Sequence, residues 1–240
     1  MSTLHLVRHA QASFLAEDYD VLSELGHDQA RRLGTYFASL GYQFDAVYSG
    51  PRQRQIHTAE LAREAMREAG GIDWPELVVL PELDEYQAEG IMKSEVPKLM
   101  AERPEIAALL EQFQGSADKR ARMRAFERVL QTVMRMWAGG QLDLSEGESW
   151  TAFTERVAEG MRRMTVAESS GQRILAFSSG GAIGVAIADI LKAPYEQALE
   201  LGWALNNASV SDVLFSAERK NLSRFNVLSH LANPSLWTYR

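Results

Sequence analysis

The chain has 240 residues, of which 46% are hydrophobic and 24% are charged, a composition typical of a folded globular protein. Its formal net charge of −7 at pH 7 argues against a nucleic acid or an anionic membrane as the main partner. The sequence contains no cysteine, which excludes disulfides, thiolate catalysis and cysteine-ligated metals. Because we find neither a signal segment nor an apolar run long enough to cross a bilayer, we expect a cytoplasmic protein.

Predicted strands alternate with predicted helices along most of the chain. The first strand, over residues 3–7, is an apolar run rich in β-formers that ends in Arg8 and His9. Helices are predicted over 23–40, 53–69, 147–167 and 182–191. Further strands are predicted over 44–49, 77–80, 173–177, 208–215 and 222–228, those over 77–80 and 173–177 being buried. This alternation favours a three-layer α/β/α fold with a mainly parallel sheet.

The alternation pauses between residues 91 and 145, which we interpret as a helical insertion within a single domain of residues 1–240. Two apolar stripes at helical spacing, on either side of a break at 115–117, predict two packed helices. The basic residues within 119–128 are expected to form a solvated helix face or, alternatively, a cap that contacts the substrate.

Polar and ionisable residues follow the ends of four predicted strands. Because the carboxyl ends of parallel strands meet at one edge of a sheet, we expect these residues to converge. Arginine guanidinium groups bind phosphate oxygens, a histidine beside them suits a nucleophile, and a carboxyl group can act as a general acid. A helix N-terminus adds backbone N–H groups that bind anions. The pattern indicates a phosphoryl-transfer site that uses no metal and no cofactor. The four groups are Arg8-His9, the 49–54 loop, the 82–85 segment and the 178–181 segment.

Several segments together resemble the histidine phosphatase superfamily, also called the phosphoglycerate mutase-like family. Arg8-His9-Ala10 is similar to the family's Arg-His-Gly signature, and the run 49–59 matches its Ser-x-x-x-x-Arg-x-x-x-Thr-Ala block. The resemblance covers nearly the whole chain outside the predicted insertion. Further similarities lie at 22–30, Leu83-Asp84-Glu85, Gly147-Glu148-Ser149 and 206–210.

This resemblance implies roles for several residues at the predicted strand ends. His9 would be the residue that is phosphorylated, and Arg8 and Arg54 would bind the transferred phosphoryl group. Glu85 would protonate the leaving alcohol and then activate water, with Glu82 and Glu89 as competitors for that role.

Two positions depart from the family pattern. Ser179 precedes Gly180 where the family usually has His-Gly, and Ala10 replaces a glycine. In the family that histidine hydrogen-bonds the phosphoryl oxygens, whereas serine keeps a hydroxyl donor without the positive charge. We therefore expect Ser179 and Gly180 to bind phosphate and the reaction to be weakened, not abolished. His57, three positions after Arg54 on a predicted helix, is a candidate supporting group, or else a packing or surface histidine.

The sequence therefore predicts a phosphomonoester hydrolase that acts through a phosphohistidine intermediate on His9, with a small-molecule phosphomonoester as its substrate. One alternative is a phosphoglycerate mutase-type phosphotransferase. The other is a phosphate-binding or regulatory protein in which Ser179 has weakened catalysis.

Overall fold

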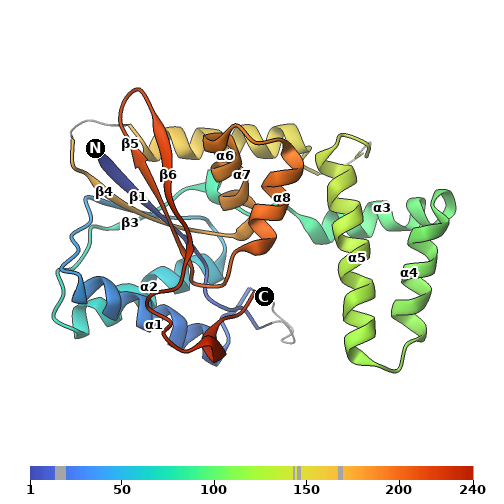
Figure 1. Ribbon diagram of the computed structural model, residues 1–240, viewed down its shortest axis with the longest axis horizontal. Helices are drawn as coiled ribbons and strands as arrows, with labels where there is room; N and C mark the ends of the chain where they lie inside the picture. The colour runs from blue at the N-terminus through green and yellow to red at the C-terminus, as the bar shows by residue number, and fades with distance from the viewer. Residues whose placement is uncertain (14–19, 143, 145–146, 167–169, 240) are drawn as a thin grey trace. The chain divides into compact units, whose positions relative to one another are not determined.

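The computed structural model describes residues 1–13, 20–142, 144, 147–166 and 170–239 (Figure 1). The chain divides into two compact units, one made of Met1–Glu85 with Glu155–Arg240 and the other of Tyr86–Thr154. The first unit contains the β-sheet, and the range 91–145 expected to form a helical insertion lies inside the second. None of the described helices is both long and apolar enough to cross a membrane.

The first unit is built on a six-stranded mixed sheet with the strand order β3-β2-β4-β1-β5-β6. The pairings β1–β4, β2–β4 and β2–β3 are parallel, whereas β1–β5 and β5–β6 are antiparallel. Arg8 lies opposite Ser178, and Ser49 lies opposite Phe177, so the carboxyl ends of β1, β2 and β4 meet at one edge. The strands are β1 (Ser2–Arg8), β2 (Ala46–Ser49), β3 (Leu77–Val79), β4 (Arg173–Ser178), β5 (Val210–Phe215) and β6 (Lys220–Val227).

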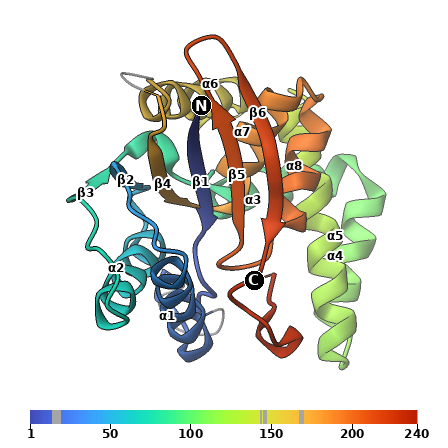
Figure 2. The ribbon, with the colours of Figure 1, turned by 60° about the vertical axis from the view of Figure 1, so that its left-hand side comes forward.

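Helices cover both faces of this sheet, with α1 and α2 on one side and α6, α7 and α8 on the other (Figures 1 and 2). On the first side, Leu33 and Phe37 of α1 pack with Val7, Leu175 and Phe177 of the sheet in one buried cluster. The predicted three-layer α/β/α fold is therefore confirmed. The helices of this unit are α1 (Glu24–Ser39), α2 (Gln53–Glu68), the part of α6 (Trp150–Met164) from Glu155 onward, α7 (Gly180–Leu191) and α8 (Tyr195–Ala204), with short 3-10 turns at Pro81–Leu83 and Pro234–Leu236.

The second unit contains α3 (Ala88–Glu102), α4 (Pro104–Gly115) and α5 (Lys119–Ala138). The prediction of two helices was wrong because it missed a second break, at Arg103. Arg103 is extended (φ −129°, ψ 94°), as a residue before proline tends to be, and Pro104 starts the next helix. Within this unit the Trp137 ring lies 5.3 Å from Tyr86 and 5.7 Å from Phe153, centroid to centroid.

Two further predictions for the first unit need correction. Residues 77–80 were expected to form a buried strand, but β3 is an edge strand in which Val78 and Val79 are 45% and 44% exposed. Helix α8 was not predicted. It packs closely on α7, since a Cβ on Gly184 of α7 would lie 2.3 Å from the Ala198 carbonyl oxygen of α8.

Candidate active site

The residues predicted at the strand ends come together at the carboxyl edge of the parallel strands. Arg54, in the first turn of α2, reaches His9 after β1, with 3.2 Å between its Nε and His9 Nε2. Glu85 Oε2 accepts a hydrogen bond of 2.9 Å from the backbone N–H of Gly181, in the first turn of α7. Ser179, the residue before α7, follows the strand residue Ser178, whose carbonyl oxygen accepts a 2.8 Å hydrogen bond from the His9 N–H.

His9 is held as the neutral tautomer with its proton on Nδ1. Its Nδ1 lies 2.7 Å from the Ala10 carbonyl oxygen, which can only accept a hydrogen bond, so Nδ1 carries the hydrogen. Arg54 Nε can only donate, so His9 Nε2 presents a lone pair. Burial lowers the pKa of His9 well below its ordinary value, and the charges of Arg54 and Arg8 lower this pKa further. The ring therefore carries its free electron pair on the side that faces the arginine.

The backbone around His9 is fixed by side chains from two other elements. Thr58 Oγ1 of α2 accepts a 3.0 Å hydrogen bond from the Ala10 N–H and donates one of 2.6 Å to the Arg54 carbonyl. The Asn207 amide nitrogen donates to the His9 carbonyl oxygen at 3.2 Å. Thr58 and Asn207 occur in the matched segments of the sequence, but their contacts with this loop were not predicted.

Both arginines have anchors that set their direction. Arg8 Nη1 donates to the Leu205 carbonyl oxygen, and the Arg8 guanidinium lies beside Gly180, 3.8 Å from where a Cβ would stand. Arg54 Nη1 pairs with Asp20 Oδ1 at 2.7 Å, while Asp20 Oδ2 accepts the backbone N–H of Gln53. Sequence reasoning missed Asp20 because it lies in a polar, turn-like stretch with no motif around it.

The segment that carries Glu85 is tied down by charged neighbours. Arg52 Nε pairs with Asp84 Oδ1 at 2.5 Å, and the same oxygen accepts the Glu85 N–H at 2.7 Å. The competing carboxylate Glu82 forms an ion pair with Arg163 of α6. These contacts favour Glu85 over Glu82 as the carboxyl group of the site.

Ser179 is buried and accepts a hydrogen bond from a residue that sequence reasoning did not single out. Gln55 Nε2 donates to Ser179 Oγ at 2.7 Å. Gly180 has a packing role in addition to any role in phosphate binding, since a Cβ there would lie 2.8 Å from the Gly202 carbonyl oxygen of α8.

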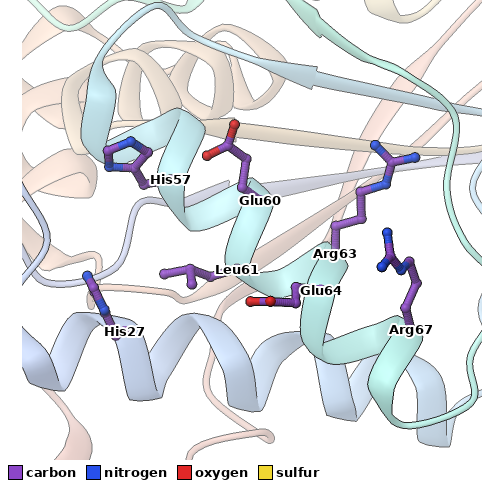
Figure 3. Close-up of a pocket in the computed structure, with 7 residues that line it drawn as sticks. All are labelled: His27, His57, Glu60, Leu61, Arg63, Glu64 and Arg67. Atoms are coloured by element: carbon purple, nitrogen blue, oxygen red, sulfur yellow. The ribbon is translucent and has the colours of Figure 1, made fainter.

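His57 lies in a different cavity, which opens between α1 and α2 (Figure 3). His27 of α1 and Glu60 of α2 are among its neighbours there, and His9, Arg8, Arg54 and Glu85 are absent from the lining. The cavity measures about 450 Å³ and is lined by His27, His57, Glu60, Leu61, Arg63, Glu64 and Arg67. Across the described ranges, no group of three or more His, Asp or Glu side chains is arranged to bind a metal ion.

The chain matches one protein-family model and part of a curated protein. A family model for the histidine phosphatase superfamily (branch 1) matches residues 4–139 and 105–228. A curated 2,3-bisphosphoglycerate-dependent phosphoglycerate mutase of Methylorubrum extorquens (strain PA1) is 34% identical over 98 residues, which are 38% of this chain and 46% of that protein. The matched part thus spans less than half the length of that relative.

Solved structures with the same architecture cover nearly the whole chain. Phosphoglycerate mutase from Bacillus anthracis str. Sterne is 19% identical with a TM-score of 0.65, covering 96% of this chain and 95% of the other. Phosphoserine phosphatase from Entamoeba histolytica, in complex with 3-phosphoglyceric acid, is 18% identical with a TM-score of 0.61, covering 96% and 100%. At these identities the similarity establishes the fold.

Proposed function

Because the chain belongs to branch 1 of the histidine phosphatase superfamily, we propose that it is a phosphomonoester hydrolase that works through a phosphohistidine intermediate on His9. The observation that carries this proposal is the state of His9. A neutral imidazole whose Nε2 lone pair faces an arginine is a nucleophile beside an anion-binding group. A buried structural histidine can share the depressed pKa, but it has no need of a ring nitrogen with its lone pair facing an arginine.

The first chemical step transfers the phosphoryl group to the protein. His9 Nε2 attacks phosphorus, a P–N bond forms, and the P–O bond to the substrate alcohol breaks. The Glu85 carboxyl group donates its proton to the leaving oxygen, so that a neutral alcohol departs. In the second step the Glu85 carboxylate takes a proton from water, the resulting hydroxide attacks phosphorus, and the P–N bond breaks to release inorganic phosphate.

Arg8 and Arg54 bind the phosphoryl oxygens in this mechanism. Arg54 Nε, which hydrogen-bonds His9 Nε2 at 3.2 Å, turns to a phosphoryl oxygen when the substrate takes its place in front of the ring. Asp20 and the Leu205 carbonyl oxygen hold the far ends of the two guanidinium groups. Loss of one such prepositioned donor costs a factor of about 10²–10³ in rate in other enzymes.

Ser179 stands where the family usually has its second histidine, so its hydroxyl supplies a neutral hydrogen bond in place of a charged one. Ser179 is buried and directly follows Ser178, whose carbonyl oxygen accepts the His9 N–H, and this position supports the assignment. The family relationship supports a small phosphomonoester as the substrate. The amoebal relative is a phosphoserine phosphatase with 3-phosphoglyceric acid bound, which makes phosphoserine and 3-phosphoglycerate the first compounds to assay.

The test is a phosphoester panel that includes a generic aryl phosphate, assayed with the wild type and with His9→Ala. We expect phosphate release by the wild type, loss of that release in His9→Ala, and transient labelling of the wild-type protein by ³²P-substrate. Wild-type turnover no higher than that of His9→Ala across the panel, from pH 5 to 9, refutes the hydrolase.

A mutase is the second candidate, because the curated relative from Methylorubrum extorquens is a phosphoglycerate mutase. Isotope-labelled phosphate that moves between the two hydroxyl positions of phosphoglycerate, with little release of free phosphate, identifies a mutase. Tight binding of a phosphorylated compound without turnover identifies the regulatory alternative.

A further inference from the structure

Gln55 lies next to Arg54 in the first turn of α2, and the two side chains contact residues that follow two neighbouring strands, β4 and β1. Arg54 reaches His9 after β1, and Gln55 reaches Ser179 after β4. Gln55 is fully buried, which is costly for an amide unless its polar atoms are hydrogen-bonded. Both polar atoms of this amide are therefore expected to have partners.

The orientation of the Gln55 amide follows from its backbone partners. Its Oε1 lies 3.1 Å from the Arg52 N–H, which can only donate. Its Nε2 lies 3.5 Å from the Leu83 carbonyl oxygen, which can only accept. Nε2 is therefore the atom that faces Ser179 Oγ at 2.7 Å, and Gln55 is the donor in that hydrogen bond.

A serine that accepts a hydrogen bond is left with its own proton to donate. In the described part of the chain, the Ser179 hydroxyl makes no capping hydrogen bond with the backbone at the start of α7. The preceding Ser178 differs, because its hydroxyl proton is already donated to the Leu83 carbonyl oxygen. Ser179 directly follows Ser178, whose carbonyl oxygen accepts the hydrogen bond from the His9 N–H. Donation by Gln55 also polarises the Ser179 hydroxyl, which strengthens it as a donor.

The close packing around Gln55 leaves it little freedom. A Cβ on Gly50 would lie 2.2 Å from Gln55 Oε1 and 2.6 Å from the Leu83 carbonyl oxygen, so only glycine at position 50 leaves room for the amide. A side chain locked in this way orients its partner before the substrate arrives.

We propose that Gln55 is a positioning residue that turns Ser179 into a hydrogen-bond donor aimed at the phosphoryl group. This inference rests on the proposed hydrolase function, because it assigns Ser179 an acceptor on the substrate. Gln55 and Ser179 together then take the place that a single histidine fills in the family pattern. The chemistry of the phosphoryl transfer is unchanged, and only the donor differs.

The test is a double-mutant cycle of Gln55→Met, which keeps the length of the side chain without its donor, and Ser179→Ala. We expect kcat to fall about tenfold in Ser179→Ala and about three- to tenfold in Gln55→Met, with little change in KM. In the double variant we expect the kcat of Ser179→Ala alone, because Gln55 has no hydroxyl left to orient. Ser179→Thr, which keeps a hydroxyl, should retain more activity than Ser179→Ala.

The matched control is Gln53→Met, the same substitution at an exposed position one residue before Arg54, where we expect wild-type kcat. If Gln55→Met lowers kcat equally in the wild type and in the Ser179→Ala variant, its role is purely structural and the proposal is refuted. Gln55→Glu provides a second variant that retains the acceptor for the Arg52 N–H. It makes Ser179 donate to the carboxylate instead of the substrate, so wild-type kcat in Gln55→Glu also refutes the proposal.

The proposed function can fail independently of this inference. If the wild type shows no turnover above His9→Ala, the hydrolase is refuted, and the same cycle is then measured as the affinity for inorganic phosphate by calorimetry. A loss of affinity on Gln55→Met that vanishes when Ser179→Ala is already present supports the positioning role even then. Equal losses with and without Ser179→Ala refute it.

Discussion

Thr58 offers a sharp test of how the loop after β1 holds the nucleophile. Its hydroxyl accepts the Ala10 N–H at 3.0 Å and donates to the Arg54 carbonyl oxygen at 2.6 Å, and both Thr58 and Ala10 are fully buried. Thr58→Val keeps the shape of the side chain and removes only the hydroxyl. The Arg54 carbonyl retains its helical N–H partner, whereas the Ala10 N–H is left buried without an acceptor.

An orphaned backbone N–H in such a place costs about 1–3 kcal/mol. For a chain of this size, 1 kcal/mol corresponds to a shift in Tm of about 2–4 °C. Thr58→Val should therefore melt several degrees below the wild type when unfolding is followed by circular dichroism. It should also lose kcat/KM, because the Ala10 carbonyl, which fixes the His9 tautomer, belongs to the same residue as the orphaned N–H.

The matched control is Thr58→Ser, which keeps the hydroxyl and loses one buried methyl group. We expect Thr58→Ser to lose about 1 kcal/mol of stability and to keep near wild-type kcat/KM. The reasoning fails if Thr58→Val retains both the stability and the kcat/KM of the wild type. It also fails if Thr58→Ser loses as much activity as Thr58→Val, since the hydroxyl is then not the group that matters.

Three further predictions concern pH and packing. Because the pKa of His9 lies well below its usual value, kcat/KM of the wild type should not fall as the pH drops through 6.5. Arg54→Gln removes a positive charge beside His9 and so raises this pKa. The acid limb of the pH–rate profile should therefore lie at higher pH in Arg54→Gln than in the wild type. Burial lowers the pKa of His230 to about 4, so between pH 6.5 and 4 the unfolded chain binds a proton that the folded protein excludes. His230 alone should contribute a fall of about 3 kcal/mol in the free energy of unfolding over that range, so urea titrations should show a flatter pH dependence in His230→Gln. Gly184→Ala should lower Tm, because the added Cβ would lie 2.3 Å from the Ala198 carbonyl oxygen. Such overpacking costs about 1–3 kcal/mol of stability, which exceeds the gain of about 1 kcal/mol from the higher helix propensity of alanine. A Tm equal to or above that of the wild type contradicts this last prediction.

The parts of the fold that sequence could predict are those decided by local periodicity. Alternation of strands and helices leads to a layered sheet, and the carboxyl ends of parallel strands must then share an edge. This rule is enough to bring His9, Arg54 and Ser179 together, although they lie far apart in the chain. The Ser23 cap of α1, which accepts the Gly26 N–H, is likewise a local signal.

The parts that sequence reasoning missed depend on tertiary context. The apolar run at residues 77–80 predicts a strand, but the same run is compatible with a strand at the edge of a sheet and with one at its centre. The exposure of Val78 and Val79 was therefore not predicted. The break at Arg103 did carry a local signal, the following proline. The Gln55–Ser179 and Arg54–Asp20 contacts join segments separated by 124 and 34 residues, and no spacing rule connects them.

The arginines of this site have two effects that pull in the same direction. Their guanidinium groups are suited to a phosphoryl dianion. Burial is the main reason that the pKa of His9 is low, and the positive charge of the arginines lowers it further, so that Nε2 is unprotonated before the substrate arrives. A bound phosphoryl group cancels part of that charge and raises the proton affinity of His9, but by then the lone pair is directed at phosphorus. Burial keeps both effects strong, because His9 is only 4% exposed and little water screens the charges around its ring. Removal of one arginine therefore weakens phosphoryl binding and, at acidic pH, lowers the fraction of His9 that is unprotonated. The shift of the acid limb in Arg54→Gln reports the pKa of His9 and not phosphoryl binding, so it separates the two effects of the arginine.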